Sequence, residues 1–133
     1  MKRVATLSLM VLLMIQVLTG CSVSTANIKS AVMARDYKDG QAVDPTTVFK
    51  ATDTFHCVAE LANAPDDTKI KVVWTAVDAG GAKDQKILDK ELVSGSGIAN
   101  FTLTHDKPFP AGKYKAELFL NDKLDKTLTF EVQ

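Results

Sequence analysis

This chain of 133 residues has little cysteine and no surplus of charge of either sign. Its two cysteines are too few for a disulfide scaffold or a cysteine-rich zinc site. Its 16 Lys and Arg residues are balanced by 16 Asp and Glu residues. The balance argues against a nucleic-acid-binding protein, because such proteins carry a basic surplus. The length fits one domain, alone or behind a targeting segment.

A run of apolar residues long enough to cross a membrane is also lacking. The longest one, Val4 to Leu18, is interrupted by three polar residues and is shorter than the roughly 20 residues of a spanning helix. It follows Lys2 and Arg3 directly. A basic start followed by an apolar run of this length is typical of a secretory signal peptide. We therefore expect residues 1–20 to be a cleaved signal.

The apolar run ends in Leu18-Thr19-Gly20-Cys21, which resembles the lipobox of bacterial lipoproteins. The resemblance implies cleavage before Cys21, a diacylglyceryl group on its sulfur and an acyl chain such as palmitate on its new amino group. Cys21 is then the lipid attachment site, and no other cofactor is expected. In such lipoproteins, an Asp directly after the lipidated cysteine implies retention in the inner membrane. Ser22 stands at this position, which implies the outer membrane in a host that has one. The alternative is an ordinary signal peptide followed by a chance cysteine.

The expected mature protein consists of the lipidated cysteine with a short tether, residues 21–27, and a domain of residues 28–133. Loss of the basic signal peptide leaves 14 Lys and Arg against 16 Asp and Glu residues, a net charge of −2. An acidic domain is not attracted to an anionic membrane, so the lipid must hold it there. The tether spans at most about 20 Å, which predicts a domain close to its membrane.

Apolar and polar residues alternate along residues 28–133, and turn residues separate the runs. In the clearest examples, the residues expected on one face are Phe55, Cys57, Ala59 and Leu61, and then Ile70, Val72, Trp74 and Ala76. The dipeptides Asp39-Gly40 and Asn121-Asp122 suit tight turns. The pattern predicts an all-β antiparallel sandwich of about seven strands. A helix remains an alternative near residue 28, and the run Ile87–Val93 fits either type.

Three residues give this sandwich a more specific resemblance. Cys57, Trp74 and Tyr114 resemble the strand-B cysteine, the strand-C tryptophan and the tyrosine corner of immunoglobulin-like domains. Ala116 stands where the second cysteine of their inter-sheet disulfide would be. The resemblance implies an immunoglobulin-like sandwich without its disulfide, in which Cys57 is a small buried apolar residue. A fibronectin-type sandwich or a small barrel is the alternative.

No set of residues predicts catalysis or a metal site. Ser94-Gly95-Ser96-Gly97 lacks the first glycine of a nucleophile elbow. Cys57 and His56 are neighbours in an expected strand and point to opposite faces. His56 and His105 have no partners at zinc-ligand spacing, and the Asp residues in turns fit turn geometry better than calcium binding. We expect neither an enzyme nor a metalloprotein.

One expected sheet face suggests binding. If Trp74 and Tyr114 point inward, side chains from the same two strands form an outer apolar patch with a lysine rim. These side chains are Phe119, Val73, Val77, Lys71 and Lys115. Such a patch is typical of a protein contact. Phe109, between two prolines, is a second candidate, although it is better suited to closing one end of the sandwich.

The sequence therefore predicts a lipid-anchored envelope protein that acts as a non-enzymatic structural or binding module, with an envelope protein or glycan as partner and no nucleic acid. The alternative is a periplasmic inhibitor or accessory factor that acts on an enzyme or an assembly machine through its loops. Those loops are Asn63–Thr68, Asp78–Gln85 and Thr104–Ala111. A small hydrolase is a third, weaker interpretation.

Overall fold

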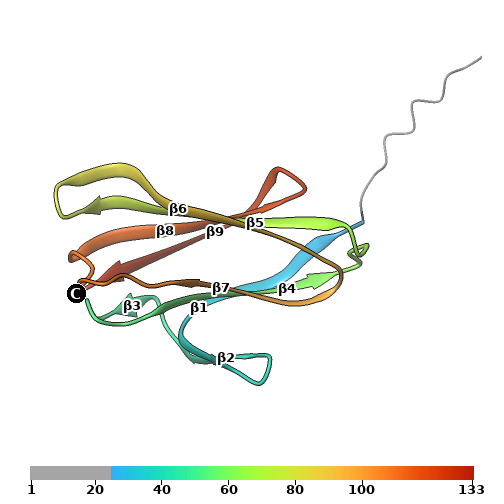
Figure 1. The fold of residues 1–133 in the computed structure, drawn as a ribbon, viewed down its shortest axis with the longest axis horizontal. Coiled ribbons are helices and arrows are strands. Elements are labelled where there is room, and N and C mark those ends of the chain that lie inside the picture. Colours follow the sequence, from blue (N-terminus) through green and yellow to red (C-terminus); the bar gives the residue numbers. More distant parts are fainter. Residues whose placement is uncertain (1–24) are drawn as a thin grey trace, which may run out of the picture.

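A computed structural model describes residues 25–133, which form two β-sheets packed face to face (Figure 1). Within this range the chain contains nine strands and no helix. The strands are β1 (Asn27–Lys38), β2 (Gln41–Pro45), β3 (Val48–Phe49), β4 (Phe55–Ala62), β5 (Thr68–Ala79), β6 (Ala82–Ser94), β7 (Gly97–Leu103), β8 (Gly112–Leu120) and β9 (Lys123–Val132). The expected signal peptide, Cys21 and most of the tether lie outside the described residues.

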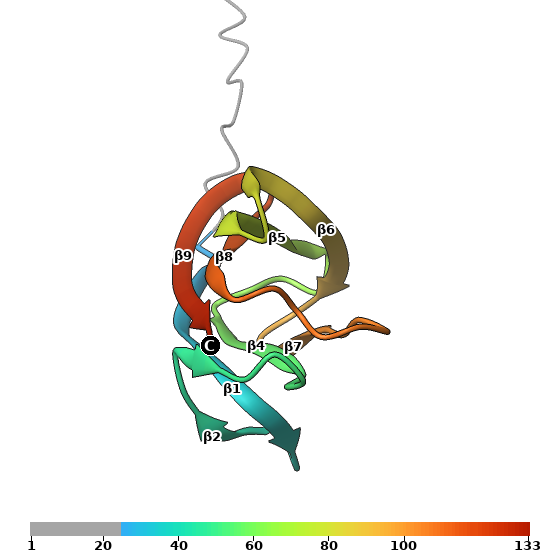
Figure 2. The same ribbon diagram turned by 90° about the vertical axis from the view of Figure 1, so that its left-hand side faces the viewer.

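The strand order is β2-β1-β4-β7 in one sheet and β3-β9-β8-β5-β6 in the other. Figure 2 shows the two layers end on. All neighbouring strands are antiparallel except β3, which pairs in parallel with β9. The chain therefore changes sheets between β2 and β3 on one side of the sandwich. On the other side, β6 and β7 are the outermost strands of their sheets.

The prediction of an all-β antiparallel sandwich is confirmed, and the helix alternative near residue 28 is wrong. The strand number is larger than the expected value of about seven. One reason is that residues 41–49 form two short strands, one in each sheet. The other is that the ambiguous run Ile87–Val93 belongs to β6.

The predicted turns lie between paired strands. Asp39 and Gly40 have φ values of 51° and 76°, and Asn121 and Asp122 have φ values of 47° and 67°. Positive φ at both central residues is the geometry of the type I′ turn, whose twist matches that of the flanking strands. These dipeptides therefore fix the β1–β2 and β8–β9 hairpins.

The core is made by the alternating residues that the sequence assigned to the inner faces. Phe55 lies at its centre and is fully buried. Its ring centroid is 4.3 Å from that of Phe109, 4.8 Å from that of Phe49 and 5.1 Å from that of Phe130. Phe109 closes one end of the sandwich, as expected, and its backbone N–H donates to the carbonyl oxygen of Ala51 at 2.8 Å.

The residues of the immunoglobulin resemblance occupy the places that it implies. Cys57, Trp74 and Ala116 are buried on β4, β5 and β8. The Tyr114 hydroxyl donates to the carbonyl oxygen of Pro110 at 2.6 Å, which is the hydrogen bond of a tyrosine corner. Strand β6 pairs with β5 and not with β7, so the strand distribution differs from that of a constant-type immunoglobulin domain.

Candidate functional site

The outer face of β5 and β8 carries most of the predicted binding residues. The two strands are antiparallel neighbours, and their register places Lys71 opposite Phe119 and Thr75 opposite Lys115. Because directly opposed residues in an antiparallel pair share a face, these side chains lie together. Val73 lies between Lys71 and Thr75 on the same face, so four of the five predicted side chains form a contiguous surface.

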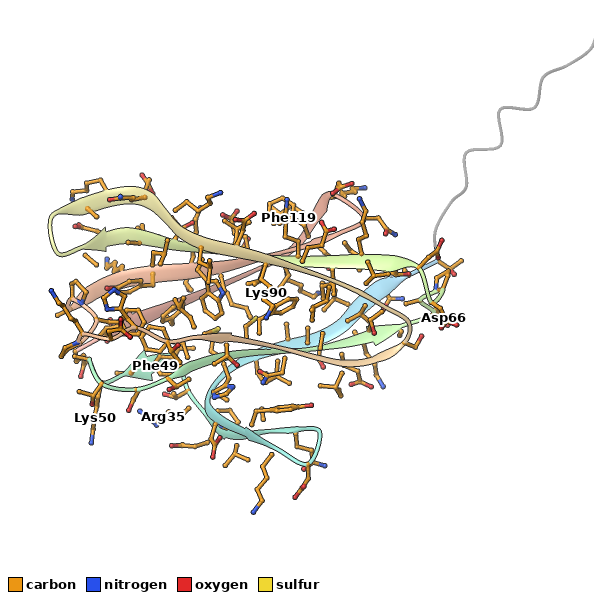
Figure 3. All side chains as sticks on the ribbon, viewed as in Figure 1. Arg35, Phe49, Lys50, Asp66, Lys90 and Phe119 are labelled. Carbon is orange, nitrogen blue, oxygen red and sulfur yellow. The ribbon has the colours of Figure 1, made fainter. Side chains whose placement is uncertain are left out.

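Lysine side chains partly cover this surface. The Lys71 ammonium nitrogen is 4.9 Å from the centroid of the Phe119 ring, a cation–π contact, and Phe119 is only half-buried. Figure 3 labels Phe119 on the side of its sheet that faces away from the other sheet. Lys115 forms an ion pair with Glu117 at 3.2 Å. Thr75 lies between the longer Lys115 and Lys86 of the neighbouring strands and is only 7% exposed. On this face Lys71 therefore covers the Phe119 ring, and the acidic side chains opposite Lys71 and Val73 are Glu91, Asp89 and Glu117.

Val77 lies at the far end of this face, away from Lys71 and Phe119. It lies where a bulge separates Ala76 from Asp78, about 20 Å along β5 from Lys71. There it lines a separate shallow hollow of about 540 Å³ with Val48, Lys113 and Glu131. The sequence predicts the face of Val77 correctly but cannot show this separation.

The three loops predicted for an inhibitor do not form one surface. Strand β5 begins at Thr68 and ends at Ala79, so the loops that precede and follow it lie at opposite ends of the sandwich, about 36 Å apart. The loop before β5 lies beside the N-terminal end, where the Thr25 hydroxyl donates to the Asn63 carbonyl oxygen at 3.2 Å. The other two loops share the far end. A partner that contacts all three loops at once would therefore have to span about 36 Å.

The far end contains a recess of about 350 Å³ that the sequence analysis missed. Its apolar lining comes from the β5–β6 hairpin and from the segment before β8, and includes Ala76, Ala79, Ala82, Phe109, Pro110 and Tyr114. Gln85, Lys86 and His105 add polar groups. These residues are widely separated in the chain, so no local sequence pattern marks the recess.

The potential catalytic groups are engaged in other contacts. His56 Nδ1 is 3.3 Å from Asn100 Oδ1 on the outer face of its sheet, and His105 Nδ1 accepts the Lys107 N–H at 3.0 Å. Cys57 points into the core, so His56 and Cys57 lie on opposite faces, as predicted. Within residues 25–133, no three His, Cys, Asp or Glu side chains are grouped closely enough to hold a metal ion.

Burial raises the pKa of the Cys57 thiol to about 12. The unfolded chain releases this proton near its ordinary pKa of 9.0, so stability falls by about 1.4 kcal/mol per pH unit between those two values. In denaturant titrations across this range, Cys57→Ala should lack this fall. Tyr114 and the lysines titrate in both proteins and cancel in the comparison. Equal pH slopes for the two proteins would contradict the buried position of Cys57.

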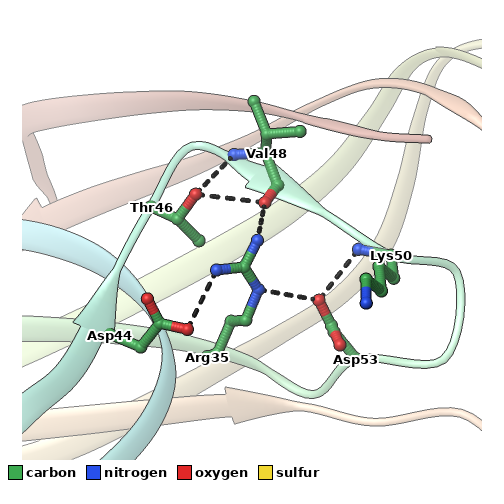
Figure 4. A network of polar contacts seen from close by, with 6 residues as sticks. All are labelled: Arg35, Asp44, Thr46, Val48, Lys50 and Asp53. Atoms are coloured by element: carbon green, nitrogen blue, oxygen red, sulfur yellow. Dashed lines mark hydrogen bonds and ion pairs between the residues drawn. The ribbon is translucent and has the colours of Figure 1, made fainter.

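Arg35 is the centre of a polar network that sequence analysis did not find (Figure 4). Its guanidinium donates to Asp44 at 2.9 Å, to Asp53 at 3.1 Å and to the Val48 carbonyl oxygen at 2.6 Å. The hydrogen bonds to Asp44 and then Asp53 are the main causes that raise the pKa of Arg35. Asp53 also accepts the Lys50 N–H at 2.8 Å. The network joins β1 to the segment that crosses between the sheets, and its side chains are already paired, which indicates a structural role.

Comparison with known proteins supports the fold of this chain but does not indicate its function. No protein-family profile matches the sequence, and no curated protein matches it. An immunoglobulin-like protein of Pseudomonas aeruginosa has a similar structure, with a TM-score of 0.59 and 16% identity over 81% of this chain and 96% of that one. The chain has an immunoglobulin-like fold. The lipoprotein resemblance gains no support from this neighbour.

Two larger proteins contain weaker matches. They are an alkylpurine DNA glycosylase of Pseudomonas fluorescens, with a TM-score of 0.49 and 12% identity, and a β-glucosidase of Listeria innocua, with a TM-score of 0.46 and 13% identity. This chain covers 81% and 77% of its own length in these matches but only 30% and 16% of theirs. Residues 25–133 include no helix that could span a membrane.

Proposed function

We propose that this protein is a non-enzymatic binding module of the bacterial envelope, anchored by lipid on Cys21 and contacting a protein partner through the outer face of β5 and β8. The observation that carries the proposal is the half-buried Phe119 ring under Lys71, with Val73 on the same face. A half-buried aromatic ring with a lysine ammonium over it offers both apolar area and positive charge to a partner.

The position of the N-terminal end supports the anchor. The hydrogen bond between Thr25 and Asn63 fixes the chain at one end of the sandwich. The steps from Cys21 to Thr25 span at most about 14 Å, so a lipid on Cys21 holds that end beside the membrane. Strands β5 and β8 extend from this end of the sandwich, and their outer face is accessible to a partner close to the membrane.

The anchor is tested by fractionating cells that express the full chain. We expect the wild type and Cys57→Ala in the membrane fraction and Cys21→Ser in the soluble fraction, because only Cys21 carries the lipid. Mass spectrometry of the N-terminal peptide should show the added diacylglyceryl and acyl groups. An unmodified Cys21 in the membrane-bound protein would disprove the anchor.

The binding face is tested by cross-linking in the same cells. Phe119→Asp should lose the cross-linked partner, because it puts a negative charge under Lys71. Val32→Asp is the matched control, because Val32 is 40% exposed on the outer face of the other sheet. Loss of the partner in both variants, or in neither, would refute the proposed face.

A further inference from the structure

Strand β6 is an unusually open edge. It pairs with β5 alone, and among residues 25–133 no strand covers its other side. It has 13 residues, and every residue from Lys83 to Glu91 is exposed. An edge strand presents unpaired backbone N–H and C=O groups, to which another chain can bind by adding a strand.

The side chains of β6 determine which residue types a partner strand should carry. Lys90 lies opposite Val72, and Leu88 lies opposite Trp74, both on the face that points into the sandwich. Leu92 continues this face and packs against the core. Leu88 is 45% exposed, and Lys90 forms no ion pair with any of the described residues. Along the inner face of β6, the side chains are therefore apolar at Leu88, positive at Lys90 and apolar at Leu92.

The outer face of the same stretch is acidic. Asp89 and Glu91 alternate with the inner residues and point away from the core. Lys86 lies 3.4 Å from Asp89, while Glu91 has no ion pair within this distance among the described side chains. A strand that pairs with β6 therefore meets acidic residues on one side and an unpaired lysine on the other.

The far-end recess lies beside the first half of β6. Ala82, Gln85 and Ile87 of β6 line it together with Phe109 and Tyr114. A strand added along β6 passes over this recess, and an apolar side chain of that strand can enter it. Edge and recess are thus two independent features of one open side of the sandwich.

We propose that β6 binds an extended segment of a partner protein, which adds to the sheet as a further strand. The segment places an acidic side chain opposite Lys90, apolar side chains beside Leu88 and Leu92, and basic side chains opposite Asp89 and Glu91. A further apolar side chain occupies the recess. This inference rests on the proposed function as a binding module and specifies a second contact, on the edge strand that lies beside the Phe119 face.

The same charges disfavour a second copy of this chain. A two-fold antiparallel pairing of β6 with itself about Lys90 opposes Lys90 to Lys90 and Asp89 to Glu91. Like charges directly opposite one another destabilise a pair of strands. An inward-pointing lysine is also a known means of preventing unspecific edge pairing. Self-pairing in this register is therefore unfavourable, whereas a strand with an acidic residue opposite Lys90 is favoured.

The test uses two capped peptides, Thr-Val-Lys-Glu-Lys-Val-Thr and the same sequence with Lys in place of Glu. They are titrated into the full chain, purified in detergent and followed by backbone amide NMR. The Glu peptide should shift β6 amides and bind about fivefold more tightly than the Lys peptide, as expected for one cross-strand charge pair. Lys90→Glu should reverse this preference, while Lys38→Glu on β1 should leave it unchanged.

Backbone methylation separates strand addition from simple surface binding. In an added strand, alternate amides of the peptide bond to β6 and the others face solvent. Methylation of one alternate set should abolish binding, and methylation of the other should leave it intact. Equal effects of both sets would overturn the proposal.

Other outcomes also refute it. No binding of the Glu peptide, shifts confined to the Phe119 face, or an unchanged preference in Lys90→Glu each disprove the β6 site. Self-association of the chain through β6 in sedimentation measurements would make a second copy the occupant. None of these results affects membrane attachment by Cys21 or the Phe119→Asp comparison, so the two proposals fail separately.

Discussion

Replacing Phe55 by alanine is expected to lower the free energy of unfolding by about 3–5 kcal/mol. The Phe55 ring is fully buried and contacts the rings of Phe49, Phe109 and Phe130. Its removal leaves a cavity that rings from both sheets cannot fill without moving. Because domains are stable by only about 5–15 kcal/mol, this one change should remove a large part of the total. Urea unfolding followed by Trp74 fluorescence measures the loss.

Phe119→Ala is the matched control for this experiment. It removes the same side chain from the half-buried outer face and should cost only about 1 kcal/mol. Similar losses for both variants would mean that Phe55 does not hold the two sheets together.

The second large effect is expected for Gly112→Ala, at about 3 kcal/mol. Gly112 begins β8 with a φ of 148°, and a Cβ atom there would lie 2.7 Å from the Cα atom of Ala79 and collide with the Asp78 carbonyl oxygen. All of these contacts are to backbone or to an atom close to it, so the strands β5 and β8 must separate locally. The same unfolding measurement checks this value.

Gly81→Ala distinguishes the collision from backbone strain alone. Gly81 has a φ of 82° but open space around its Cα atom. Its replacement should therefore cost only about 1 kcal/mol, the penalty for a left-handed residue. If Gly81→Ala costs as much as Gly112→Ala, then the close approach of β5 to Gly112 is not responsible for the effect.

The sequence predicted best those structural features that depend only on residues close together in the chain. Alternation placed Trp74 and Tyr114 inside and Lys71 and Phe119 outside, because successive side chains in a strand point to opposite faces. The dipeptides that tolerate positive φ marked the hairpin turns. The Ile87–Val93 run stayed ambiguous for a related reason. Because β6 lies at the edge of its sheet, most of its side chains are exposed on both faces, so burial does not impose alternation there.

Other predictions concern residues outside the described range or properties that the structure does not test. The cleaved signal, the lipid on Cys21 and the envelope location all depend on the N-terminal sequence. They remain predictions, as do the absence of catalysis and the use of the Phe119 face.

The sequence alone determined that this chain is an all-β sandwich, where its turns lie and which residues face its core, because each of these follows from neighbours along the chain. Only the tertiary structure decided that β6 is an open edge, that Val77 lies apart from Phe119, and that Arg35 joins partners 9, 13 and 18 residues away. These features depend on which strands pair and in what register. Strand pairing brings together distant segments, and no local periodicity records it.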